Sequence, residues 1–211
     1  MMYPPIHTYC TELTKEFDAI PSQRKELLKK ISDYLAAKQK AGSPAKLTYI
    51  CTHNSRRSHF GQVWAEVASA FYGIKNISAF SGGTEVTTFN SNAINALKRV
   101  GFTIKPLNSE KNTHYQVIYD DLEKPINSFS KVYDDPANPQ KEFAAVMTCR
   151  EAENNCPFIP GAELTLGIPY DDPKSFKSTP QKNQKYDECC RQIALETLYA
   201  FSNVWKSTSL N

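Results

Sequence analysis

The feature that most constrains the fold is an alternation of short apolar runs with segments of helical periodicity. Four runs are typical of strands, at residues 47–50, 77–80, 102–104 and 143–147. Between the first three, apolar residues recur every three or four positions, and each such segment ends at a glycine, Gly73 or Gly101. Strands separated by helices form parallel β-α-β units. The sequence therefore predicts an α/β fold, a three-layer doubly wound sheet of about four parallel strands.

The regions outside this alternation are predicted as follows. Residues 1–45 form an N-terminal helical extension, whose main helix has Ser22 as its N-cap and ends before the Gly42-Ser43-Pro44 connector. Residues 46–211 form the main domain. Within it, residues 115–120 and 130–134 read as strands with a turn near Lys124-Pro125, residues 150–180 as loops, and residues 183–205 as a long closing helix.

Composition excludes several classes of protein. The 211 residues are 40% hydrophobic and 22% charged, which is ordinary for a globular chain. A net charge of +3, without a long basic block, gives no ground for a nucleic-acid partner. An apolar run of about 18 residues is absent, as is an N-terminal signal sequence, so we expect no membrane partner and a cytoplasmic location. There the six cysteines are expected to be reduced thiols.

Two cysteines follow predicted strands, where ligands of parallel sheets bind. Cys51 opens a loop that leads into the helix near His59. Such an entry gathers free backbone N–H groups at the positive end of a helix and favours an oxyanion. We expect the thiol to be activated there, with Arg57 binding two oxygens in a fork and Ser58 donating a hydrogen bond to the sulfur. The predicted oxyanion loop comprises Thr52, His53, Asn54, Ser55, Arg56, Arg57 and Ser58.

The second cysteine, Cys149, lies seven residues before Cys156. Seven residues of helix rise about 10.5 Å, whereas a disulfide needs Cα atoms within about 7 Å. If the segment is helical when reduced, a bond between the two requires it to unwind. The spacing leaves open that both are plain core thiols, and it does not suit zinc, so we expect no metal and no cofactor. Cys10, Cys189 and Cys190 receive no role.

These residues together resemble the low-molecular-weight protein tyrosine phosphatase superfamily, and within it the thioredoxin-coupled arsenate reductases. Cys51, Asn54, Arg57 and Ser58 stand in register with the superfamily loop of Cys, any residue, Gly, Asn, two residues, Arg and Ser. The turn at residues 81–85, the Asn-Asn-Cys-Pro ending at residues 154–157 and the Asp172-Pro173 pair look like further family segments. The resemblance covers about residues 46–205.

The sequence departs from the family pattern at two positions. His53 occupies the loop's usual glycine position and would carry any unusual backbone angle that this position requires. Gln62 stands where the family often has a glutamate that helps some reductases to hold potassium, which leaves cation binding open.

The resemblance implies a thiol relay. Cys51 would attack arsenate, Arg57 would neutralise its charge, and Asp172 would protonate the leaving oxygen. Cys149 would then attack Cys51 and release arsenite, and Cys156 would attack Cys149 to leave a disulfide for thioredoxin to reduce. The cysteine pair favours this reading over the alternatives.

Two other functions stay open. As a phosphatase, Cys51 would attack phosphate on the tyrosine of a phosphoprotein, with Asp172 as the general acid. Arsenate and phosphate are near-isosteres, so the loop alone does not separate the two activities. A non-enzymatic oxyanion or redox sensor, with the N-terminal helix as its output, ranks lowest.

Overall fold

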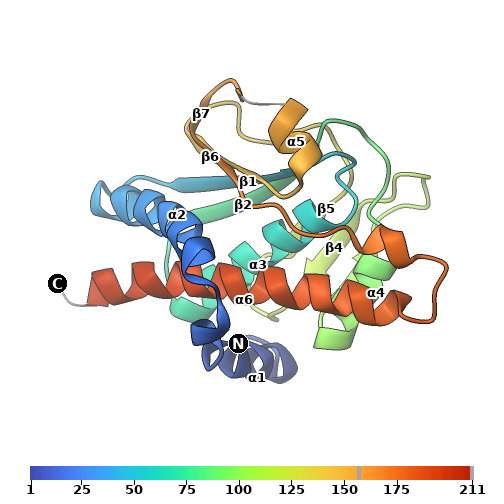
Figure 1. Cartoon of the computed structure of the whole chain (residues 1–211), viewed down its shortest axis with the longest axis horizontal. Helices are drawn as coiled ribbons and strands as arrows, with labels where there is room; N and C mark the ends of the chain where they lie inside the picture. Colours follow the sequence, from blue (N-terminus) through green and yellow to red (C-terminus); the bar gives the residue numbers. More distant parts are fainter. Residues whose placement is uncertain (156–157, 210–211) are drawn as a thin grey trace.

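The computed structural model describes residues 1–155 and 158–209, except for the side chains of residues 153–155 and 207–209. Its main sheet has four parallel strands in the order β2-β1-β6-β7 (Figure 1). The strands are β1 (Ala45–Cys51), β2 (Ile77–Gly83), β6 (Phe143–Met147) and β7 (Ala162–Gly167). The sheet with its flanking helices confirms the predicted α/β class.

The helices cover the two faces of the sheet unequally. In chain order they are α1 (Pro4–Thr14), α2 (Ser22–Lys40), α3 (Arg57–Tyr72), α4 (Ser91–Val100), α5 (Arg150–Asn155) and α6 (Lys182–Ser209), with the short 3-10 helices η1 (Phe17–Ala19) and η2 (Pro173–Phe176). Figure 1 shows α3 and α6 on one side of the sheet and α5 on the other. The second layer is therefore thin.

The alternation of β6 shows how its residues serve both faces. Ala144 and Val146 belong to the large core shared with α3 and α6, whereas Phe143, Ala145 and Met147 belong to a smaller cluster with Ala152 of α5. All five strand residues are buried. Since successive side chains of a strand point to opposite faces, only an unbroken apolar run satisfies both layers.

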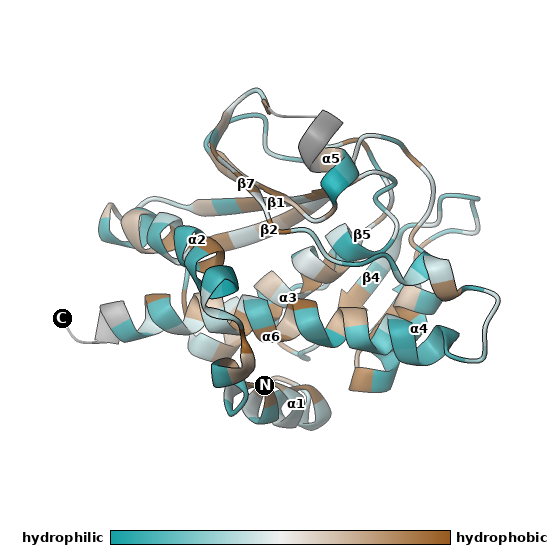
Figure 2. Cartoon of the chain, in the orientation of Figure 1, coloured by the Kyte–Doolittle hydropathy of each residue, from teal (hydrophilic) through white to brown (hydrophobic). Residues whose placement is uncertain are grey.

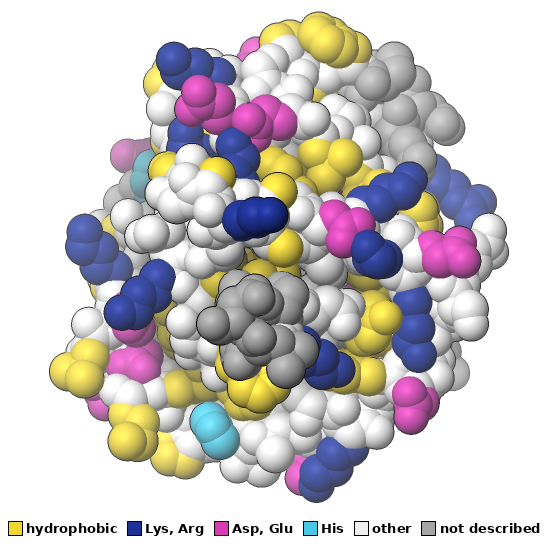
Figure 3. Space-filling model, turned by 90° about the vertical axis from the view of Figure 1, so that its left-hand side faces the viewer, with side chains coloured by type: hydrophobic (Ala, Val, Ile, Leu, Met, Phe, Trp, Pro, Cys, Tyr) yellow, Lys and Arg dark blue, Asp and Glu magenta, His cyan; other side chains and the backbone are white. Residues whose placement is uncertain are grey.

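The long helices are amphipathic, and Figure 2 shows hydrophobic and hydrophilic residues alternating along α2 and α6. On α6, Ile193, Leu198 and Phe201 are fully buried. The face seen in Figure 3 carries basic and acidic side chains interspersed, without one block of either sign. No helix in the described part of the chain is long and apolar enough to cross a membrane.

The strand predictions hold in part. Residues 103–106 form β3, but this strand pairs antiparallel with β4 (Tyr115–Ile118) in a separate sheet completed by β5 (Ile126–Ser128). The predicted strand at 130–134 is reduced to one bridge, between Gly83 and Val132. The fourth parallel strand is instead β7, inside the stretch predicted as loop.

The N-terminal segment carries two α-helices, α1 and α2. Their apolar residues, among them Ile6, Cys10, Leu28 and Leu35, are buried in the same core as α6. Helix α2 begins at Ser22, one residue earlier than predicted, so its N-cap is Pro21, which makes no side-chain capping hydrogen bond, rather than Ser22. Treating residues 1–45 as an extension separate from the main domain remains our proposal.

Candidate active site

The loop after β1 occupies the carboxyl end of the sheet and leads directly into α3. Arg56 precedes the helix and no side chain caps it, so the first N–H groups of α3 are free for a ligand. Within the described residues, no backbone N–H of residues 53–56 donates to a backbone carbonyl. Unpaired N–H groups at a helix N-terminus form a cradle for an anion, as the sequence predicts.

The unusual backbone angle of the loop falls on Asn54 rather than on His53. Asn54 has a φ of 41°, and His53 is not among the described residues with positive φ. Asparagine is several-fold enriched in this left-handed region, so the histidine costs less than the sequence suggested. The Asn54 amide also braces the loop, because its Oδ1 accepts from the Lys131 N–H at 2.8 Å.

The thiol of Cys51 contacts the hydroxyl of Ser58, with 3.1 Å between Sγ and Oγ. Asn54 Nδ2 donates to the same Ser58 Oγ at 2.9 Å. Because Ser58 Oγ accepts from Asn54, its own proton is available to the sulfur. All three side chains are nearly or fully buried.

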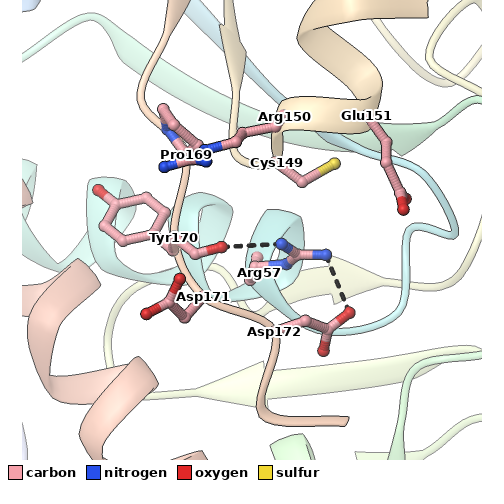
Figure 4. A pocket seen from close by; sticks show the side chains of 8 residues that line it. All are labelled: Arg57, Cys149, Arg150, Glu151, Pro169, Tyr170, Asp171 and Asp172. Carbon is pink, nitrogen blue, oxygen red and sulfur yellow. Dashed lines mark hydrogen bonds and ion pairs between the residues drawn. The ribbon is translucent and has the colours of Figure 1, made fainter. Parts of the chain in front are cut away.

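Arg57 connects the loop to the segment before η2 (Figure 4). Its Nη1 donates to the Tyr170 carbonyl at 2.8 Å, and its Nη2 donates to Asp172 Oδ2 at 2.9 Å. Arg56 Nε forms a further ion pair with Asp172 Oδ1 at 3.0 Å. The Arg57 Nε is buried without a hydrogen-bond partner, which is the kind of donor that a bound oxyanion satisfies.

Cys149 lies beside this loop and is buried. Its Sγ is 3.4 Å from Thr52 Oγ1, and the same Thr52 hydroxyl donates to Glu151 Oε2 at 2.8 Å. The Ala152 N–H also donates to the sulfur at 3.4 Å. With its proton directed to Glu151, the Thr52 hydroxyl is left to accept from the Cys149 thiol. This arrangement gives the thiol proton a path toward a carboxylate.

Arg57 and Cys149 line the same cavity of about 310 Å³, together with Arg150, Glu151, Pro169, Tyr170, Asp171 and Asp172. Figure 4 shows their side chains around this space. The wall is predominantly polar and charged, and Cys51 is not among the lining residues. A small charged ligand suits this lining better than a large apolar one.

The structure thus brings together all of the predicted site residues that it describes, namely Cys51, residues 52–58, Cys149 and Asp172. Cys156 lies outside the described residues. Glu151 and the Tyr170 carbonyl carry no signal in the sequence, because only the folded chain places them beside Thr52 and Arg57. Gln62 provides an amide, which accepts from Ser81 Oγ at 2.7 Å and donates to the Asn127 carbonyl at 3.2 Å.

The five described cysteines are free, buried thiols. Burial raises the pKa of Cys10 and Cys190 to about 12, and Cys190 accepts a hydrogen bond from Trp64 Nε1 at 3.3 Å. Protonated thiols of this kind are inert core residues. Among the described residues no group of three or more His, Cys, Asp or Glu is placed to hold a metal ion.

His59, just inside α3, predicts how stability depends on pH. Its ring is fully buried against Phe89, and burial with the nearby Lys131 lowers its pKa from 6.5 to about 3. The unfolded chain therefore takes up a proton that the folded chain refuses. The resulting contribution is fully present above pH 6.5 and is lost as the pH falls toward 3, by up to about 5 kcal/mol.

Urea unfolding between pH 7 and pH 4 tests this expectation. His59→Gln, which cannot be protonated, should show a smaller loss of unfolding free energy on acidification than the wild type. Glu66, whose pKa burial raises to about 7, acts in the opposite direction, but it is present in both proteins and cancels. Parallel pH profiles for the two proteins would contradict the assignment.

Known proteins resemble this chain in sequence and in fold. No family model matches the chain. In sequence, the chain is 27% identical over 125 residues to "Arsenate reductase 2" of Staphylococcus haemolyticus, which covers 59% of this chain and 76% of that protein. In structure, it is similar to the arginine phosphatase YwlE in a form with a phosphorylated active-site serine, with a TM-score of 0.51, 11% identity and coverage of 79% and 99% of the two chains.

A low molecular weight phosphotyrosine phosphatase from Vibrio cholerae O395 also aligns, with a TM-score of 0.47, 15% identity and coverage of 78% of this chain and 98% of that one. The name of the sequence relative matches the reductases that the sequence motifs resemble. The predicted resemblance to arsenate reductases is confirmed in sequence, and the fold is shared with a solved phosphatase. The similar proteins are enzymes, as expected.

Proposed function

We propose that this protein reduces arsenate to arsenite through a relay of cysteine thiols. The observation that carries the proposal is the position of Cys149, which is hydrogen-bonded to the residue next to Cys51 and lines the same cavity as Arg57. Hydrolysis of a phosphate ester needs only Cys51, the loop and an acid. A second buried thiol beside the loop is what a reduction requires.

In the first step, the Cys51 thiolate attacks arsenic while the As–O bond breaks. Asp172 supplies the proton that lets the oxygen leave as water. Arg57 and the free N–H groups of the loop balance the oxyanion charge. Ser58 holds the nucleophile in its thiolate form through the contact described above.

In the second step, the Cys149 thiolate attacks Cys51 Sγ. The electron pair of the S–As bond passes to arsenic, which leaves as arsenite, and a Cys51–Cys149 disulfide remains. Cys156 then attacks Cys149, which frees Cys51 as a thiolate and leaves a Cys149–Cys156 disulfide. The dithiol of thioredoxin supplies the two electrons that restore both thiols. The roles of Cys149 and Cys156 come from the family resemblance.

The relay predicts a separation between two variants. With thioredoxin, thioredoxin reductase, NADPH and arsenate, Cys149→Ser should release no arsenite, because nothing displaces the Cys51 adduct. Cys156→Ser should release about one arsenite per chain and then stop as the Cys51–Cys149 disulfide. Sustained NADPH oxidation should fall at least about a hundredfold in both. Cys10→Ala, a buried thiol of α1, is the matched control and should keep turning over.

Sustained turnover by Cys156→Ser would exclude the relay as written. The second candidate function is a phosphatase, which the pairing of Asp172 with Arg57 at the cavity also supports. Hydrolysis of para-nitrophenyl phosphate by the wild type without any reduction of arsenate would select that function instead. Both Cys149→Ser and Cys156→Ser should then hydrolyse the ester normally.

A further inference from the structure

Tyr170 occupies the point at which the two halves of the site meet. Its N–H donates to the Thr148 carbonyl at 3.1 Å, and its own carbonyl accepts from Arg57 Nη1 at 2.8 Å. Thr148 directly precedes Cys149 in the sequence, and Asp172 lies two residues after Tyr170. A shift of Tyr170 would therefore move the acid, the arginine and the second thiol relative to one another.

The ring of Tyr170 is held by a residue of the N-terminal segment. Arg24, in the first turn of α2, has its Cζ 4.8 Å from the centre of the ring. A cation over an aromatic face attracts it more strongly when the pair is shielded from water. Here the Tyr170 residue is only 8% exposed and the Arg24 side chain 16%.

Arg24 is itself fixed by Glu196 of α6. Its Nε donates to Glu196 Oε2 at 2.9 Å, and its Nη2 lies 2.8 Å from the same oxygen. Gln192 Nε2 donates to the other carboxylate oxygen, Oε1, at 3.1 Å. Burial, with the Glu196 carboxylate adding to it, raises the pKa of Tyr170 well above its usual value. The phenol therefore stays neutral, and the guanidinium keeps a fixed place above it.

We infer that Arg24 of the N-terminal segment is a positioning residue of the active site. It holds the Tyr170 ring, and the backbone of Tyr170 in turn sets Arg57 and Asp172. The inference rests on the proposed function for the roles of these two groups. It gives α2, which precedes the predicted main domain, a role in the chemistry of the active site.

Two readouts separate positioning from plain stability. Protection of Cys51 from iodoacetamide by inorganic phosphate reports oxyanion affinity and needs no turnover. The ratio of turnover on para-nitrophenyl phosphate to turnover on phenyl phosphate reports the general acid, because phenolate needs a proton to leave far more than para-nitrophenolate does. A variant that only destabilises the fold lowers turnover on both esters by the same factor and leaves this ratio unchanged.

Four variants are compared. Arg24→Met removes the cation, and the double variant Arg24→Met with Glu196→Gln removes it without leaving a buried carboxylate unpaired. Both should weaken phosphate protection about tenfold and lower phenyl phosphate turnover more than para-nitrophenyl phosphate turnover. Arg24→Lys keeps the charge and should recover part of the loss. Lys29→Met, on the same helix with an exposed ion pair to Asp33, should match the wild type.

Unchanged phosphate protection and an unchanged leaving-group ratio in the two Arg24→Met proteins would overturn the inference, even if their melting temperatures fall. A wild type that neither reduces arsenate nor hydrolyses either ester would refute the proposed function instead. In that case the phosphate arm alone decides about Arg24. If phosphate does not protect Cys51 in the wild type, both the proposed function and the inference about Arg24 are refuted.

Discussion

Replacing Cys51 with serine should abolish arsenate reduction and aryl phosphate hydrolysis alike, by about 10⁴-fold to 10⁶-fold. In the proposed mechanism the Cys51 thiolate is the nucleophile at the floor of the loop, and a serine hydroxyl in its place stays protonated at neutral pH. A hydrogen bond from Ser58, whose Oγ lies 3.1 Å from the sulfur, would stabilise a charged thiolate much more than a neutral serine hydroxyl. Both proposed activities therefore depend on the Cys51 thiolate.

The same variant should keep its oxyanion site. Asn54 and Arg57 make their contacts to Ser58, Lys131, Tyr170 and Asp172, none of which involves the sulfur. Calorimetric titration with phosphate should thus give an affinity within about threefold of the wild type. Lost binding together with lost activity would show that Cys51→Ser disturbs the loop, whereas residual activity above about one per cent would show that another nucleophile operates.

Local pattern made the loop predictable. The strand, the polar loop and the helix are consecutive in sequence, so Cys51, Arg57 and Ser58 must lie around the same few N–H groups wherever the rest of the chain goes. The sequence did not show that Asn54, rather than its neighbour His53, takes the left-handed backbone angle. The choice between these two residues depends on what braces the loop. Here that is Lys131, 77 residues from Asn54.

The sequence predicted less well which strands belong to which sheet. The run at 102–104 is apolar enough for either sheet, and only its pairing with residues 115–118 decides that β3 is antiparallel. Strand β7 was not predicted because it lies at the edge of the sheet, where five of its six residues stay partly or fully exposed and the apolar signal is weak. Contacts such as Arg24 with Tyr170 join residues far apart in sequence and leave no local signal.

The ion pairs of Asp172 lead to a second prediction, with two effects of opposite sign. Its carboxylate engages Arg56 and Arg57, whose side chains are only 8% and 9% exposed. An oxyanion entering the loop must compete with this carboxylate for the Nη2 of Arg57. Asp172→Ala should therefore bind phosphate about tenfold more tightly, while turnover falls by about 10² to 10⁴ because the general acid is gone.

Thermal unfolding gives an independent measure of the same competition. Without Asp172 the two arginines lose their counter-charge, so Asp172→Ala should melt below the wild type in plain buffer. Added phosphate replaces the missing charge and should raise its melting temperature more than that of the wild type. Asp171→Ala, which removes an exposed carboxylate from the same cavity, controls for net charge and should show a much smaller gain. Equal gains in the two variants would mean that bulk charge, rather than the pairing of Asp172 with the arginines, governs oxyanion affinity.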